Sequence, residues 1–262
     1  MKLAISNIAW PVEQDEKIYK LMGEYGFTGL EIAPTRVFGN HPYNNLNKSA
    51  AWWEWLDNAY GFCVPSMQSI WYGRQERLFG NQEEQNSLLR YTKEAVDFAV
   101  SIKCHNLVFG SPKNRNMPDG TDRNSIFPFF YEMGEYALSK GAVIGMEANP
   151  VLYHTNFMNY TSDVVKMVRE VGSEGFRINL DVGTMLYNKE DAEEIRNIVQ
   201  YISHVHISEP GLEPIERRGM HKELAEHLRN GQYQGYVSVE MSAQQEISVV
   251  EGVLEYIREI FG

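Results

Sequence analysis

The feature that most constrains this chain is an alternation of short apolar runs with longer helical segments, repeated eight times. Runs rich in Val, Ile and Phe indicate buried strands, and their alternation with helices is typical of a parallel α/β fold. Eight such units in 262 residues match the roughly 250 residues of a complete (β/α)₈ barrel. We therefore expect one domain over residues 1–262, a parallel eight-stranded barrel with outer helices. The predicted strands are Leu3 to Asn7, Gly29 to Ile32, Phe62 to Gln68, Asn106 to Phe109, Ala142 to Glu147, Phe176 to Asp181, Ile202 to Ser208 and Tyr236 to Met241.

The segments between the strands carry helical periodicity. In Glu83 to Ile102, apolar residues recur at intervals of three and four, which predicts one stripe packed on the barrel, and Gln245 to Phe261 repeats the pattern. Long loops are expected at residues 33–47 and 209–220, on the side where barrel strands end, where they would shape a pocket. A doubly wound open sheet is the alternative, but the segment after the first strand, SNIAWP, lacks its glycine-rich phosphate turn.

Charge and composition exclude several classes of partner. No segment approaches the roughly 20 apolar residues that span a bilayer. The formal net charge of −11 would repel a polyanion, so nucleic acid is a disfavoured partner. The first residues lack a secretory h-region, and Cys63 and Cys104 have no nearby cysteine partner. These observations predict a cytoplasmic protein with free thiols.

Four predicted strands end in an acid or an imidazole on the face that turns into the barrel. In AVIGMEA and FRINLDV, apolar outward residues alternate with inward rows that end in Glu147 and Asp181. In ISHVHIS the inward residues are His204 and His206, and YVSVEM ends its inward row in Glu240. The four end groups follow one another at roughly the length of one βα unit. We therefore expect them at similar height in the barrel mouth.

Three carboxylates gathered without a cation would repel one another and raise their own pKa values, whereas a divalent ion would satisfy them together with one imidazole. The sequence thus predicts one metal ion bound by Glu147, Asp181, His206 and Glu240. The oxygen and nitrogen ligands suit Mn²⁺, Mg²⁺, Co²⁺, Fe²⁺ or Zn²⁺, and the sequence does not choose among them. The alternative is that these acids are ordinary polar residues of a barrel mouth, solvated or paired with Arg177.

The segments GMEANP, NLDVGT, HVHISEP and VSVEMS resemble, in this order, those of the xylose isomerase-like TIM barrel superfamily, and specifically its sugar phosphate isomerase/epimerase family. The resemblance covers essentially the full chain. It implies that the same four residues bind the metal and that Glu147 and Glu240 are the catalytic pair. One departure follows Asp181, where many relatives carry His or Asn and this chain has Gly183 and Thr184.

This resemblance implies a metal-dependent isomerase or epimerase of a small sugar, sugar phosphate or polyol. A carbonyl chelated by the metal would acidify the neighbouring C–H, and a glutamate would remove the proton. The sequence does not decide between epimerisation and isomerisation, nor whether the substrate is phosphorylated. Three alternatives stay open: a lyase or dehydratase with the same first step, an endonuclease IV-like phosphodiesterase, and a non-catalytic sugar-binding barrel.

Residues just after predicted strands are candidates for substrate binding. Adjacent arginines on a loop are often only solvated, tryptophans often belong to the core, and a histidine that opens a helix is often exposed. Glu31, at the end of the second strand, is either a group supporting the metal site or part of a rim salt bridge. The Trp-rich run 51–55 suggests helix packing or a homo-oligomer contact. The candidate substrate-binding residues are Trp10, Gln68, Trp71, Asn149, Glu209, Arg217 and His221.

Overall fold

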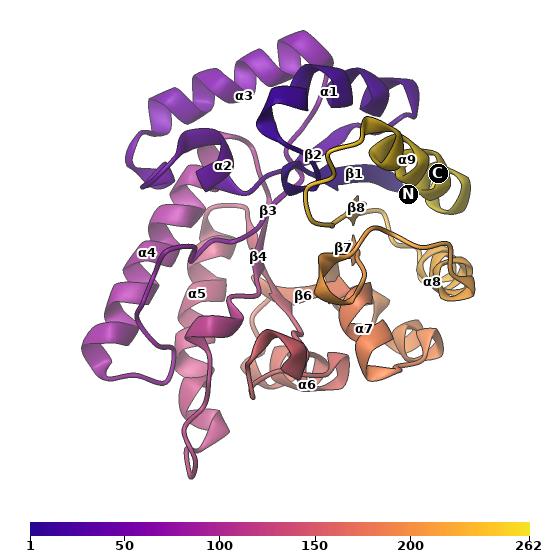
Figure 1. Cartoon of the computed structure of the whole chain (residues 1–262). Coiled ribbons are helices and arrows are strands. Elements are labelled where there is room, and N and C mark those ends of the chain that lie inside the picture. Colours follow the sequence, from indigo (N-terminus) through magenta and orange to yellow (C-terminus); the bar gives the residue numbers. More distant parts are fainter.

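The alternating pattern folds into eight parallel strands that form a barrel with helices around it, as the computed structural model, which describes residues 1–262, shows (Figure 1). The sheet order is β2-β1-β8-β7-β6-β5-β4-β3. The strands are β1 (Lys2–Ser6), β2 (Gly29–Glu31), β3 (Ser66–Met67), β4 (Asn106–Phe109), β5 (Val143–Glu147), β6 (Phe176–Asp181), β7 (Ile202–Ile207) and β8 (Tyr236–Val239). The helices are α1 (Asp15–Glu24), α2 (Pro34–Phe38), α3 (Leu46–Tyr60), α4 (Gln82–Ser101), α5 (Phe127–Ser139), α6 (Thr161–Val171), α7 (Val182–Asn188), α8 (Gly219–Asn230) and α9 (Ile247–Phe261). The predicted (β/α)₈ barrel is confirmed.

The barrel closes between β2 and β3, where the ladder is weakest. Only Ser66 and Met67 form a regular strand in the segment predicted as Phe62 to Gln68. Pro65 interrupts the segment because proline has no backbone N–H to donate. The backbone amides of Cys63 and Gln68 still donate to Thr28 and Ile32, at 3.0 and 2.9 Å. These bonds join β3 to β2 and complete the ring.

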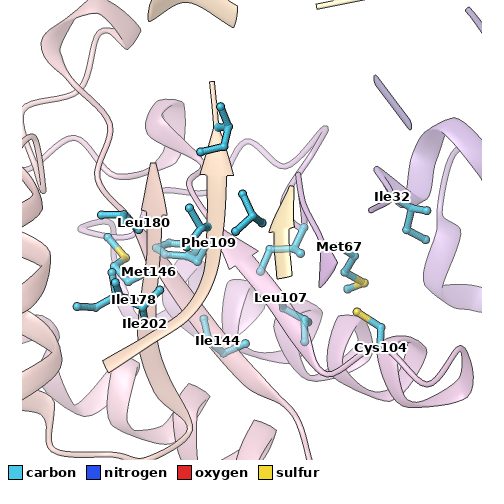
Figure 2. Close-up of a cluster of buried hydrophobic side chains, with 14 of the residues drawn as sticks. Ile32, Met67, Cys104, Leu107, Phe109, Ile144, Met146, Ile178, Leu180 and Ile202 are labelled. Atoms are coloured by element: carbon cyan, nitrogen blue, oxygen red, sulfur yellow. The ribbon is translucent and has the colours of Figure 1, made fainter. Parts of the chain in front are cut away.

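The outward faces of the strands pack on the helices and form the main apolar core. Figure 2 shows part of it, where Leu107 and Phe109 of β4, Ile144 of β5 and Ile178 of β6 lie together. Each of these side chains is at most 1% exposed. Alternate strand residues therefore point to the helices, and the intervening ones enter the barrel. The barrel interior is unusually polar, since Ser6, for example, accepts a hydrogen bond from Gln68 inside it.

Helix α4 begins one residue before the predicted start because Asn81 caps it, accepting from the backbone N–H of Glu84 while Glu84 bonds back to Asn81. Helix α9 packs beside β1 and α1 and brings the two termini together (Figure 1). The Met1 amino group donates to the Phe261 carbonyl at 3.1 Å. No helix combines the length and the apolarity needed to cross a membrane.

One of the two predicted long loops differs from the expectation. Residues 33–47 mostly form α2 and a 3₁₀ turn at Pro42–Asn44, because the two prolines start short helical turns. Residues 209–220 do form an irregular connection that ends in the first turn of α8. The other long connections at the carboxyl ends of the strands are residues 68–81, between β3 and α4, 110–126, between β4 and α5, and 148–160, between β5 and α6.

Candidate metal centre and active site

The four residues that the sequence singles out lie at the carboxyl ends of consecutive strands. Glu147 and Asp181 end β5 and β6, His206 lies in β7, and Glu240 directly follows β8. Each is at most 8% exposed. The strand register is staggered, however: Glu147 pairs with Asn179, and Asp181 pairs with His206. Asp181 therefore lies two residues further along the sheet register than Glu147, as the shear of a barrel requires.

His206 is the centre around which two of the carboxylates gather. Its Nδ1 lies 3.0 Å from Oε1 of Glu147 and 3.2 Å from Oε2 of Glu240. The ligand atoms of these three residues all lie within 4.8 Å of one another. Ligands of one ion at about 2.0 to 2.3 Å lie at most about 4.6 Å apart, so the trio needs little adjustment to hold one.

Glu31 supports this histidine from the other side. Its carboxylate is fully buried, with Oε2 at 3.0 Å from Nε2 of His206 and 2.8 Å from Nε2 of His204. A proton on Nε2 of His206 is thus held by Glu31, and Nδ1 is left to face Glu147 and Glu240. Metal-binding histidines are commonly backed by a carboxylate in this way. Glu31 therefore forms an interior contact and not a rim salt bridge.

The charged groups of the cluster shift one another's pKa values. Burial, together with Glu147 and Glu240, raises the pKa of Asp181 to about 7, and burial also raises the pKa of Glu240. Burial alone would lower the pKa of His206, but Glu31 and Glu240 raise it well above its ordinary value. Such carboxylates carry more negative charge than one histidine neutralises, and a divalent cation would balance it. The donor set therefore fits a bound metal ion.

Asp181 enters the same cavity but is held apart from the trio. Its carboxylate accepts hydrogen bonds from the Gly183 backbone at 2.9 Å, from Thr184 Oγ1 at 3.0 Å and from the Ser208 hydroxyl. A Cβ on Gly183 would lie 2.7 Å from the Ser208 oxygen. Gly183 and Thr184, the departure seen in the sequence, thus serve here to orient Asp181.

Glu147 is oriented by two amides. Asn149 donates to its Oε2 at 2.9 Å, and Asn179 donates to its Oε1 at 2.7 Å. Gly110 lies so close that an added Cβ would be 2.8 Å from the same carboxylate. The buried Arg115 donates to the backbone carbonyl of Glu147 at 2.8 Å, which fixes the end of β5. The carboxylate therefore has little freedom to turn away.

Glu147, Asp181 and Glu240 line a cavity of about 180 Å³ at the barrel mouth. Two of the candidate substrate-binding residues, Gln68 and Asn149, lie in its wall. The Oδ1 of Asn149 is buried and has no hydrogen-bond partner, so it is available to a ligand hydroxyl. The remaining wall residues were not predicted from the sequence: Ser69, Val108, Gly110, Ser111, Pro112, Tyr153 and Leu212.

The comparisons with known proteins agree with this architecture. The family described as xylose isomerase-like TIM barrel matches residues 19–260. The chain belongs to this family. No curated protein sequence matches significantly.

Solved structures share the barrel of this xylose isomerase-like chain at low identity. A 3-keto-D-glucoside 4-epimerase from E. coli has a TM-score of 0.78 at 20% identity, covering 99% of both chains. A D-psicose 3-epimerase from Clostridium cellulolyticum H10 has a TM-score of 0.75 at 16% identity, covering 99% of this chain and 91% of its own. An AP endonuclease of family 2 from Brucella melitensis has a TM-score of 0.76 at 16% identity, covering 99% of both chains.

The two tryptophans proposed to contact substrate lie in the core of this xylose isomerase-like barrel. Trp10 is 1% exposed and donates to Asp15 at 2.7 Å, which places it outside the cavity. Trp71 is 2% exposed, donates to Thr92 at 2.8 Å and packs on Phe109. Trp71 borders a neighbouring cavity. Core packing satisfies both side chains, so neither is placed to stack on a ligand at the metal trio.

Two charged candidates on the loop after β7 are occupied elsewhere. Glu209 is 3% exposed, and Arg218 holds its carboxylate with bonds of 2.6 to 3.0 Å. Arg217 is exposed and pairs with Glu259 at 3.0 Å. Neither side chain lines the cavity of this barrel. The acids of the site also lack the arginine partner considered from the sequence, because Arg177 pairs with Glu174.

His221 is neither an exposed helix start nor a cavity residue. It is fully buried in α8, with Nδ1 3.0 Å from the hydroxyl of Tyr256 and its ring against Phe261 of α9. Its Nε2 has no partner. Burial, assisted by Arg218, lowers the pKa of His221 to about 4. Its position indicates a packing role between α8 and α9.

The burial of His221 predicts a loss of stability in acid. Because its folded pKa lies below the ordinary value, its contribution is complete above about pH 6.5 and is lost as the pH falls towards 4. Between pH 7 and pH 4, the free energy of unfolding of the wild type should therefore fall by up to about 3 kcal/mol more than that of His221→Gln. Urea unfolding at both pH values measures this, with the exposed His105→Gln as control. Equal pH slopes for His221→Gln and the wild type would contradict it.

The remaining histidines do not extend the metal centre. His41, His105 and His154 are exposed, and His227 pairs with Glu193 at 3.3 Å. A second cluster that could hold an ion contains Glu31, His204 and His206, and so shares His206 with the first. The two groups therefore offer one candidate ion position beside His206, with a supporting carboxylate, and not three separate positions.

Proposed function

We propose that this chain is a divalent-metal-dependent epimerase or isomerase of a small sugar. The observation that supports this most strongly is the approach of Glu147 and Glu240, from two different strands, to within 3.2 Å of one histidine nitrogen in a cavity of about 180 Å³. The names of two structural neighbours, a 3-keto-D-glucoside 4-epimerase and a D-psicose 3-epimerase, support the same reaction class. In both names the inverted carbon is next to a keto carbon.

The metal would be held by Glu147, His206 and Glu240. Asp181, which lies in the wall of the same cavity but apart from the trio, would have to move towards them to serve as the fourth ligand. A bound divalent ion would supply Lewis-acid polarisation of the sugar carbonyl. The raised pKa of Glu240, which follows from burial, makes its carboxylate a better proton acceptor near neutral pH. Glu147 is held in one orientation by Asn149 and Asn179 and so faces a fixed position in the cavity.

The chemistry of the pair follows from these positions. One glutamate takes the proton from the carbon beside the carbonyl, and the other returns a proton to the opposite face, which inverts that carbon. Delivery of the proton to the adjacent carbon gives isomerisation instead. Epimerisation is the favoured outcome because two separate carboxylates are available to serve two faces of the sugar.

The test is hydrogen exchange at carbon in deuterated water. We expect the Mn²⁺-loaded protein to introduce deuterium beside the carbonyl of at least one of D-fructose, D-psicose, D-tagatose and methyl 3-keto-D-glucoside, measured by NMR. Removal of the metal with EDTA should stop the exchange, and added Mn²⁺ should restore it.

Other products would identify the competing functions. An unsaturated product would indicate a lyase or dehydratase, and tight sugar binding without exchange would indicate a non-catalytic barrel. The phosphodiesterase alternative is disfavoured by the net charge of −11, which repels nucleic acid, and by the histidines that lie outside the centre. Cleavage of an abasic DNA duplex by the metal-loaded protein would contradict that exclusion.

A further inference from the structure

A second, larger cavity adjoins the one at the metal centre. Its volume is about 460 Å³, and it shares Ser69, Ser111 and Pro112 with the inner cavity of about 180 Å³. The inner cavity alone is smaller than the roughly 300 to 1,000 Å³ of typical small-molecule sites, whereas the two together fall within that range. The inner space thus suits one sugar unit, and a larger ligand would extend outward past the shared residues.

Where the two cavities meet, each of two neighbouring connections contains a serine with an unusual backbone conformation. Ser69, two residues after β3, has a φ of +55°, and Ser111, two residues after β4, has a φ of +46°. Side chains other than glycine rarely adopt this left-handed region, and such positions gather at ligand-binding sites. Each serine starts a tight turn, with its carbonyl accepting from Tyr72 at 2.9 Å and from Asn114 at 3.1 Å respectively. The turns carry both loops outward and form the walls of the outer cavity.

The charges of the two cavities argue against a phosphate. The inner wall contains the carboxylates of Glu147, Asp181 and Glu240, and no lysine or arginine. In the outer wall, the charge of Arg74 is already met by Glu76 and by the ring of Tyr91. Only the exposed Lys113 is left, and one mobile lysine is a weak phosphate site compared with a group of fixed donors.

The outer wall has instead the features of a sugar subsite. Tyr72 is 68% exposed although it is a large aromatic residue, and it lies in the cavity wall beside the exposed amide of Gln75. An aromatic ring packs on the C–H face of a pyranose, while amides bond its hydroxyls. Tyr72 is not among the residues that pack in or against the apolar core, so its ring is free to contact a ligand.

We propose that the reacting keto sugar carries a second sugar unit, which binds in the outer cavity against Tyr72. This proposal rests on the proposed function and refines its substrate class: a glycosylated keto sugar is preferred to a free or phosphorylated monosaccharide. The glycosidic bond is not broken. It connects the two cavities past Ser69 and Ser111.

The test uses one ketose with different substituents at either end. D-fructose is compared with its 1-phosphate and 6-phosphate and with its 1-O- and 6-O-glucosyl derivatives, trehalulose and palatinose. For the Mn²⁺-loaded protein, we measure the dissociation constant by calorimetry and kcat/KM for exchange in deuterated water. At least one glucosyl-fructose should bind, and exchange, about tenfold better than fructose.

Variants localise the effect. Tyr72→Ala should remove the advantage of the glucosyl-fructose and leave fructose within about twofold, whereas Tyr131→Ala, an exposed tyrosine on α5, should change neither. Equal affinity for fructose and both glucosyl-fructoses, or a preference for either phosphate, would overturn the inference while leaving the proposed function intact. Discrimination in binding without exchange in this series would support the subsite, and the proposed function would be overturned if D-psicose, D-tagatose and methyl 3-keto-D-glucoside also showed no exchange.

Discussion

Glu240→Gln should lower the rate of carbon-bound proton exchange by at least about 10² to 10⁴, the usual contribution of a general base. Glutamine keeps the shape of the side chain but cannot accept the proton, and it also weakens a metal ligand. Glu147→Gln should have an effect of the same size, because the two carboxylates approach the same nitrogen of His206. The rate is measured by NMR in deuterated water, for every protein at one fixed Mn²⁺ concentration that saturates the wild type.

A matched control separates this effect from a general loss of charge at the barrel mouth. Glu213 is exposed on the connection between β7 and α8 and lies outside the cavity. Glu213→Gln should keep the wild-type rate, and circular dichroism should show that all three variants are folded. Substantial exchange, above about a tenth of the wild-type rate, in both Glu147→Gln and Glu240→Gln would refute the assignment.

Glu31→Gln should weaken Mn²⁺ binding by about 10- to 100-fold, although Glu31 itself does not line the cavity. The amide can still accept the Nε2 proton of His206, but it no longer supplies the negative charge that makes Nδ1 a stronger ligand. Calorimetric titration measures the affinity. Glu190→Gln, a half-buried carboxylate that bonds Thr161 outside the barrel, is the control and should leave the affinity unchanged. An unchanged affinity in Glu31→Gln would show that this residue only fills space.

Much of the fold could be predicted because strand and helix patterns are local. The run FRINLD in β6 alternates apolar and polar residues so regularly that both its bounds and its inward face follow from the sequence. β3 could not be bounded in the same way, because the effect of Pro65 depends on which neighbour the strand pairs with. The same applies to α2, where Pro34 starts a short helix inside a segment that composition describes as a loop.

The candidate ligands could be located because each ends an inward row of its own strand. The contact by which Glu31 supports His206 could not be predicted, because the two residues meet across the barrel at a sequence separation of 175 residues. The staggered position of Asp181 depends on the shear, which no single strand encodes. The left-handed backbone at Ser69 and Ser111 has no local sequence signal comparable to a glycine, so these two residues of the cavity walls could not be predicted. His221 was misplaced because helical periodicity does not say which side chain will meet α9.

Titration of Mn²⁺ into the metal-free protein tests most directly whether side chains from neighbouring strands form one cation site. We expect one saturable site per chain in the wild type and its loss, or a weakening of at least about 100-fold, in both Glu147→Gln and Glu240→Gln. Saturable binding that is unchanged in both variants, or no binding to the folded wild type, would contradict it.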